Sequence, residues 1–449
     1  MQEIVPLRFR LINNVCSTAA GAIARTGFLF AAALTLAAGE PAPLSLAEAL
    51  RLADTSSPAL VGARAGSDEA RAQTRAARAA LQPRIALEGG AMRTDDPVAV
   101  FGGKLRQGRF GTEDFAINAL NHPAPITDFT IGARLDQPLF AGGALAAGRD
   151  AAARAAGAAE AGAVDERARA RLEILRAYFT VPLADAAVAA TRGALDLARN
   201  HTALLRAAVN AGTALETDLL RVEVFASGLE SDLVRRESDA ALARARLAAL
   251  IGHPNDDFIL TDPLDPEAPL PDGLARRDLG AARLARDAAD AGRRVANAPY
   301  FPTAGLFAAW NQDRDGGASG RAYYTVGIGV RWTLYDGGRR AADADAARAR
   351  ADAARARVDG LEAAAVTDRR AAAARLDSAR RRLGLAGQSR ESAREVHRVA
   401  ALREKAGDGL LSDTLDAEGM RLRIELESIM ARYDVIVARA EAAYAAGDA

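Results

Sequence analysis

The feature that most constrains the fold of this 449-residue chain is an internal duplication. A pair of adjacent glycines and a later Ala-Gly pair each occur twice, at an offset of 195 residues (337 − 142). The two landmarks are 69 residues apart in each half (212 − 143 and 407 − 338). The glycines are Gly142, Gly143 and Gly212 in the first half, and Gly337, Gly338 and Gly407 in the second. Two long repeats, each one supersecondary unit, describe such a chain better than two unrelated domains.

The N-terminal region predicts an export signal. Residues 1–39 place basic residues before a short apolar run that ends in small residues, with cleavage expected near Ala38 or Gly39. The alternative is a misassigned start upstream of a buried helix. The single cysteine, Cys16, lies within this segment, so the exported protein is expected to contain no disulfide.

The remaining chain divides at a segment rich in Pro and Asp. Residues 253–274 are expected to form an extended linker between a first repeat at 40–252 and a second repeat at 275–449. The first repeat is longer because of residues 94–128, which contain several Gly and Pro residues and are expected to form an outer loop.

Each repeat contains a segment of alternating apolar and polar residues before its glycine pair. The segments are 129–136 and 324–333, and the period of two is that of a β-strand. Their expected partners, 85–92 and 303–311, alternate less regularly. Each has about the 9–11 residues of a tilted strand across a bilayer. A soluble sandwich strand alternates too, but four strands close no barrel alone, so we expect closure with other copies of the chain.

Long Ala-rich helices are expected after each glycine pair. Residues 143–212 contain one proline, Pro182, which is expected to kink or split the helix. The return helix that ends near Ile251 and the C-terminal helix place apolar residues at a period of 3.5, which predicts a coiled-coil seam. These residues are Leu219, Val222, Ala226, Leu229, Leu233, Ala240, Ala243, Leu247 and Leu250, and then Leu415, Leu422, Leu426, Ile429, Tyr433 and Ile436. Charged residues recur every few positions, so none of these helices is expected to span a membrane.

Short motifs mark the junctions between these elements. They are Leu44-Ser45-Leu46-Ala47-Glu48-Ala49-Leu50, Ser57-Pro58, Ala80-Leu81-Gln82-Pro83, the two glycine pairs, Ala211-Gly212 and Ala406-Gly407. In order, duplication and spacing they resemble the TolC family of outer-membrane channels, over almost the whole exported chain from Leu44 to Tyr444.

The resemblance implies a mainly α fold with a small β part. Long helical-hairpin coiled coils would form an α-barrel in the periplasm, and four strands per subunit would contribute to a trimeric, twelve-stranded transmembrane β-barrel. The implied function is an outer-membrane channel subunit that is the passive exit duct of a tripartite efflux pump or a type I secretion system. Its partners would be two further copies, a periplasmic adaptor (membrane fusion) protein, an inner-membrane pump and outer-membrane lipid.

The resemblance also assigns roles to the repeated landmarks. Gly212 and Gly407 would lie at the hairpin tips that dock the adaptor. The adjacent glycines at 142–143 and 337–338 would make the tight turns from strand to helix, a structural role.

Three aspartates near the tips are candidates for the periplasmic aperture. Asp413 and Asp416 match paired aspartates that line this mouth in the family, and Asp218 is the counterpart of Asp413 in the first repeat. In a trimer such carboxylates would form rings that favour cations. The alternative is that these residues stabilise helix N-termini by capping and by their charge.

The chain departs from the family pattern beside these aspartates. Members whose closed mouth is held by an Arg–Asp contact have an arginine where this chain has Gly409, and a tyrosine where it has Glu404. Other contacts, such as those of Arg221 or Arg403, are therefore candidates for the gate.

The sequence gives no sign of catalysis. Basic and acidic residues number 58 each, so no charge excess points to nucleic acid. The four histidines lack metal-site spacing, and no nucleophile or nucleotide motif is present; they are His122, His201, His253 and His397. We therefore expect no enzyme activity, metal or cofactor. The rival hypothesis is an exported coiled-coil scaffold or adaptor, although an adaptor would have one helical hairpin rather than two.

Overall fold

The computed structural model describes residues 42–253, 257–317 and 320–447, and the predicted signal peptide lies outside these residues. The chain divides into two units, Met1–Ala42 and Pro43–Ala449. The second unit is mainly α-helical with a small β part, as the sequence predicts.

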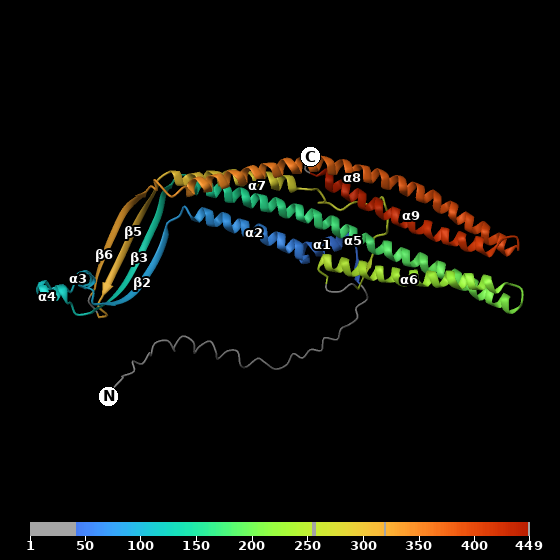
Figure 1. Ribbon diagram of the computed structural model, residues 1–449, viewed down its shortest axis with the longest axis horizontal. Helices are drawn as coiled ribbons and strands as arrows, with labels where there is room; N and C mark the ends of the chain where they lie inside the picture. Colours follow the sequence, from blue (N-terminus) through green and yellow to red (C-terminus); the bar gives the residue numbers. More distant parts are fainter. Residues whose placement is uncertain (1–41, 254–256, 318–319, 448–449) are drawn as a thin grey trace, which may run out of the picture. The chain divides into compact units, whose positions relative to one another are not determined.

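Two long helical hairpins dominate this unit (Figure 1). The first consists of α5 (Ala144–Asn210) and α6 (Glu216–Ile251), and the second of α8 (Arg339–Lys405) and α9 (Leu411–Ala446). The long helices have 67 residues each and the return helices 36 each. The equal lengths of the two long helices follow from the equal spacing of the glycine landmarks that enclose them.

Of the two effects expected of Pro182, a kink or a split, the split is wrong, because α5 continues through this residue. A proline removes one backbone hydrogen bond, which packing on both sides can offset. The neighbouring Tyr178 and Val181 are buried in the core. The frequent charges on which the expectation of no membrane-spanning helix rests are interrupted in α5, where one 18-residue window has a mean hydropathy of 1.2 and passes as a span by length and composition. That window is 44 % buried, and core helices that cross no membrane have the same composition.

Shorter elements support the hairpins. They are β1 (Ala42–Leu44), α1 (Leu46–Ser56), α2 (Pro58–Ala79), β4 (Phe258–Leu260), α7 (Asp278–Asn297) and the 3₁₀ turn η2 (Ala298–Tyr300). The Ser45 side chain caps α1 by accepting a hydrogen bond from the Glu48 amide at 3.2 Å. Helices α2 and α7 pack along α5, and α7 also packs on α8. Strand β4, which lies in the predicted linker, pairs with β1.

The four predicted strands form one antiparallel sheet in the order β2-β3-β5-β6. They are β2 (Arg84–Thr94), β3 (Ile126–Ala141), β5 (Thr303–Arg314) and β6 (Gly320–Arg331). Strands from both repeats thus meet at the centre, where β3 pairs with β5, and the strands lie side by side in Figure 1. Strands β2 and β6 are the edges, and each pairs on one side only among the described residues.

One face of the sheet is apolar and exposed. On β6, the side chains of Tyr324, Val326, Ile328 and Val330 are 61–79 % exposed. The strand register continues this face across β5, where Trp310 lies opposite Tyr324. The other face carries polar and small side chains, which are Asp128, Thr130, Gly132, Arg134 and Asp136 on β3 and Asn311 and Asp313 on β5.

The segment between β2 and β3 is helical rather than a plain loop. It contains α3 (Pro97–Arg106), the 3₁₀ turn η1 (Thr112–Phe115) and α4 (Ile117–Asn121). The extra length of the first repeat lies here, as predicted, but its helices were not predicted. Their apolar pattern is short and is interrupted by Gly and Pro residues. Phe110 packs edge-on against both Phe101 and Phe115, with ring centroids 4.7 and 5.1 Å apart.

The main hydrophobic core joins both repeats. It contains buried side chains of α1, α5, α6, β4 and α9, with Tyr178 at 0 % exposure. The Tyr178 hydroxyl is 2.9 Å from the Leu44 carbonyl oxygen and 2.7 Å from an Asp262 carboxylate oxygen. A second, smaller cluster, in which Leu195, Leu229 and Leu422 are buried, joins the two hairpins nearer their tips. All predicted seam residues of α6 and α9 are buried or half-buried.

Candidate functional site

The two hairpin tips have the same backbone geometry. Helix α5 is followed by Gly212 at φ +74°, and α8 by Gly407 at φ +76°. In the first tip the Thr213 amide donates to the Ala208 carbonyl, and in the second the Asp408 amide donates to the Arg403 carbonyl, both at 2.9 Å. A glycine tolerates this left-handed conformation without a Cβ penalty and so ends each helix sharply.

The two glycine pairs also lie in left-handed backbone. The φ angles of Gly142, Gly143, Gly337 and Gly338 are between +61° and +89°. Gly143 and Gly338 immediately precede α5 and α8, at their N-caps. At Gly142 space is limiting too, because a Cβ would lie 2.3 Å from the Ala298 carbonyl oxygen.

The candidate aperture residues lie in the first turns of the return helices. Helix α9 begins at Leu411, with Asp413 in its first turn and Asp416 three residues later, so both exposed carboxylates lie on one side of the helix. Asp218 is half-buried in the first turn of α6. Neither N-cap residue, Leu215 or Leu410, provides a side-chain capping bond. The helix-stabilising interpretation is therefore limited to the favourable charge near a helix N-terminus.

The two arginines suggested for the gate form contacts within their own hairpins. Arg403 donates to the Asp408 carbonyl at 3.2 Å and lies 3.7 Å from its carboxylate, both at the tip of the second hairpin. Arg221 lies 3.9 Å from Asp218 on the same helix. In the described part of the chain, no ion pair joins either arginine to the opposite hairpin.

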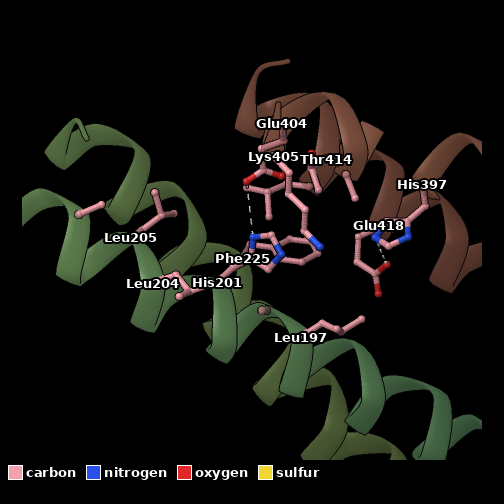
Figure 2. Close-up of a pocket in the computed structure, with 14 residues that line it drawn as sticks. Leu197, His201, Leu204, Leu205, Phe225, His397, Glu404, Lys405, Thr414 and Glu418 are labelled. Carbon is pink, nitrogen blue, oxygen red and sulfur yellow. Dashed lines mark ion pairs between the residues drawn. The ribbon is translucent and has the colours of Figure 1, made fainter. Parts of the chain in front are cut away.

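A cavity of about 370 Å³ separates the two hairpins just above the tips. Figure 2 shows His201 of α5 facing Glu404 of α8 across it, with 3.8 Å between Nδ1 and Oε1. On the second hairpin the buried Glu418 carboxylate lies 3.1 Å from Nε2 of His397. Arg421 also donates to Glu418, with distances of 2.6 and 2.8 Å. The large apolar side chains of the wall are Phe225, Leu197, Leu204, Leu205 and Leu415.

This arrangement is not visible in the sequence, because about 200 residues separate His201 from Glu404 in the chain. There Glu404 is only a departure from the family pattern, and the histidines lack metal-site spacing. The duplication is the feature of the sequence that points to this pair. It makes α5 and α8 equivalent helices, so His201 and Glu404 both lie near the tip of their hairpin.

Comparison with known proteins agrees with this architecture. The model of the outer membrane efflux protein family matches residues 49–253 and 274–448. No curated protein gives a significant sequence match.

Solved structures share the fold at low sequence identity. VceC from Vibrio cholerae is 21 % identical, with a TM-score of 0.73 over 89 % of this chain and 95 % of that protein. CmeC from Campylobacter jejuni is 17 % identical, with a TM-score of 0.74 over 90 % and 87 %. MtrE from Neisseria gonorrhoeae, in its open state, is 21 % identical, with a TM-score of 0.72 over 89 % and 88 %. The family match covers most of the chain, and the chain therefore belongs to the outer membrane efflux protein family, a family of channels in the outer membrane with a helical part in the periplasm.

Proposed function

We propose that this chain is one subunit of a homotrimeric channel that is the passive exit duct of a tripartite efflux pump or a type I secretion system. The observation that carries this proposal is the four-stranded sheet, with its two open edges and its exposed apolar face. In a bilayer both edges need partners, because unpaired backbone groups have no water to bind there. Pairing of β6 of one copy with β2 of the next would close a barrel without an edge.

Two inferences about the helical part belong to the same proposal. The hairpin tips at Gly212 and Gly407 would dock a periplasmic adaptor protein, which connects the duct to an inner-membrane pump that supplies the energy. The coiled-coil surfaces beside the tips offer grooves of the kind that helices recognise. Asp413 and Asp416 would line the periplasmic mouth, and three copies would place carboxylate rings around it.

The alternative of an exported coiled-coil scaffold or adaptor receives less support. In such a protein the strand face at Tyr324–Val330 would expose large apolar side chains to water, which is unfavourable. Both helical hairpins are also complete, whereas an adaptor would have one.

Single-channel recording tests the proposed aperture. The purified protein is reconstituted into planar bilayers, and the ratio of cation to anion permeability is measured for the wild type and for the double variant Asp413→Ala, Asp416→Ala. We expect the ratio to fall toward unity in the double variant, because the negative ring is removed. The matched control is Asp239→Ala, which removes an exposed carboxylate of α6 away from the tip. Equal selectivity in all three proteins would refute the ring, and a protein that forms no channel at all would refute the duct.

A further inference from the structure

The segment between β2 and β3 is docked closely onto the ends of the central strands. A Cβ on Gly103 of α3 would lie 2.6 Å from Cδ1 of Ile126, at the start of β3. The salt bridge from Arg109 to Asp315, at 2.8 Å, connects the same segment to the end of β5. These contacts define its position on the polar face of the sheet.

Three buried polar side chains meet under this segment. Gln107, which follows α3, is 2 % exposed, Asp128 of β3 is 4 % exposed, and Asp313 of β5 is 1 % exposed. The register pairs Thr130 with Asp313, so Asp128 and Asp313 are diagonal neighbours on the polar face. The Gln107 amide nitrogen donates to Asp128 Oδ1 at 2.8 Å and to the Thr127 carbonyl at 3.0 Å.

The atoms of this cluster that have no partner are all oxygens. Asp313 Oδ1 and Gln107 Oε1 are buried and accept no hydrogen bond from the described residues. The unpaired Oε1 belongs to the same side-chain amide whose nitrogen donates to Asp128. A buried acceptor without a donor is unfavourable. What would complete the cluster is therefore a donor or a cation.

The nearby protein charges do not neutralise the two carboxylates. Asp128 is close enough to Asp313 to repel it, and the Tyr323 side chain forms a hydrogen bond with Asp313. Arg106 attracts Asp313 electrostatically, and Arg321 lies opposite it in the register. Neither arginine forms a salt bridge with Asp313 in the described part of the chain. Two carboxylates thus remain to be balanced in a buried place, which a divalent cation would do.

We propose that Asp128, Asp313 and Gln107 form a binding site for a hard divalent cation of the size of calcium. Calcium takes six to eight oxygen ligands at about 2.3–2.6 Å, and accepts carboxylates, amide oxygens and backbone carbonyls in irregular arrangements. The Thr127 and Arg314 carbonyls accept hydrogen bonds from the Gln107 amide nitrogen, at 3.0 and 3.4 Å, so the remaining ligands of the cation would be water molecules. Magnesium demands a stricter octahedral geometry. The bound cation holds the α3–α4 segment to the two central strands.

This site differs from a cluster of acidic residues in its third ligand. Within the described ranges no three His, Cys, Asp or Glu side chains converge as a metal site. Here the third ligand is the amide of Gln107, which comes from the docked segment, so cation binding depends on that segment being in place. The inference does not depend on the proposed export function.

Terbium luminescence tests the site in the full-length protein in detergent. Terbium replaces calcium, and Tyr323 lies close enough to sensitise its emission. We expect a saturable rise in emission under tyrosine excitation that calcium reverses by competition. Asp313→Asn should weaken terbium binding at least about tenfold, because it removes a charged ligand. The matched control Asp95→Asn, which changes an exposed carboxylate of the same segment, should bind terbium like the wild type.

Thermal unfolding provides a second, independent readout. In chelator, Asp313→Asn should melt at or above the wild-type temperature, because the variant removes the repulsion between the two carboxylates. Added calcium should raise the melting temperature of the wild type and leave that of the variant unchanged. If terbium binds the wild type and Asp313→Asn equally and calcium changes neither melting curve, the cluster holds only water or a shared proton and the proposal is wrong.

Discussion

At the scale of single residues, Asp54 connects the first short helix to the long helix of the first hairpin. Its carboxylate accepts a 2.6 Å hydrogen bond from Nε of Arg167 and a 3.1 Å bond from Nη2 of Arg171. Burial alone would raise the pKa of Asp54, but the hydrogen bonds and charges of the two arginines outweigh it and lower the pKa below 3.8. A lowered carboxylate pKa adds stability above the ordinary pKa of the group, and this stability is lost as the pH falls through the lowered value.

Asp54→Asn should therefore destabilise the protein at pH 7 by about 1–2 kcal/mol, because two arginines lose their charged partner. The difference from the wild type should shrink below pH 4 and vanish once Asp54 is protonated in the fold. Chemical denaturation at pH 7 and at pH 3 measures the difference in the free energy of unfolding between the variant and the wild type at each pH. The control is Asp68→Asn, since Asp68 and Arg71 form an exposed pair on α2 that should contribute little. A pH-independent effect of Asp54→Asn would show that charge is not its cause.

At the scale of elements, the junction between β3 and α5 depends on two glycines with different surroundings. Both have positive φ, so Gly143→Ala should cost about 1–2 kcal/mol through backbone strain alone. Around Gly143 an added Cβ meets no described atom within 4 Å, whereas at Gly142 it meets the Ala298 carbonyl oxygen. Gly142→Ala should therefore cost at least about 1 kcal/mol more than Gly143→Ala. Melting temperatures of the two variants test the ranking, and equal losses would contradict the predicted clash.

The elements of the fold were largely predictable because the same glycine landmarks mark the ends of helices and strands in both repeats. The strands were found from their alternation and the return helices from their heptads, and both were confirmed. The helix was not split at Pro182, because the effect of a proline depends on packing that no local pattern reveals. The α3–α4 segment was missed for a similar reason, since its short helices depend on contacts with β3 and on the aromatic contacts of Phe110.

The side-chain clusters were less predictable than the elements. His201 faces Glu404 only because two hairpins from different repeats pack together. Asp128 and Asp313 meet because the sheet order places β3 beside β5, and 185 residues separate them in the chain (313 − 128). The duplication suggested which elements correspond, but correspondence does not say which of them touch. That information is in the sheet order and helix packing, and it requires the three-dimensional structure.

At the scale of the whole molecule, the exposed face of the sheet separates a membrane channel from a soluble scaffold. Ile328 lies on the apolar face of β6, and Thr325 lies on the opposite face of the same strand. If the apolar face meets lipid, Ile328→Arg should cost about 2–4 kcal/mol near the middle of the bilayer. Thr325→Arg adds the same charge toward the polar face, where water is expected, and should be tolerated.

The measurement is the yield and native mass of detergent-extracted protein from the outer membranes of cells that express each variant with residues 1–39 included. The wild type and Thr325→Arg should give the mass of the proposed trimer, because one copy with four strands cannot close a barrel alone. Ile328→Arg should give a much lower yield of this species, since the edges of β2 and β6 cannot join in lipid when the strand does not insert. Equal trimer yields from both variants would show that the apolar face does not contact lipid. A soluble monomer of the wild type would instead favour a periplasmic scaffold, because the edge strands β2 and β6 would then not pair with other copies.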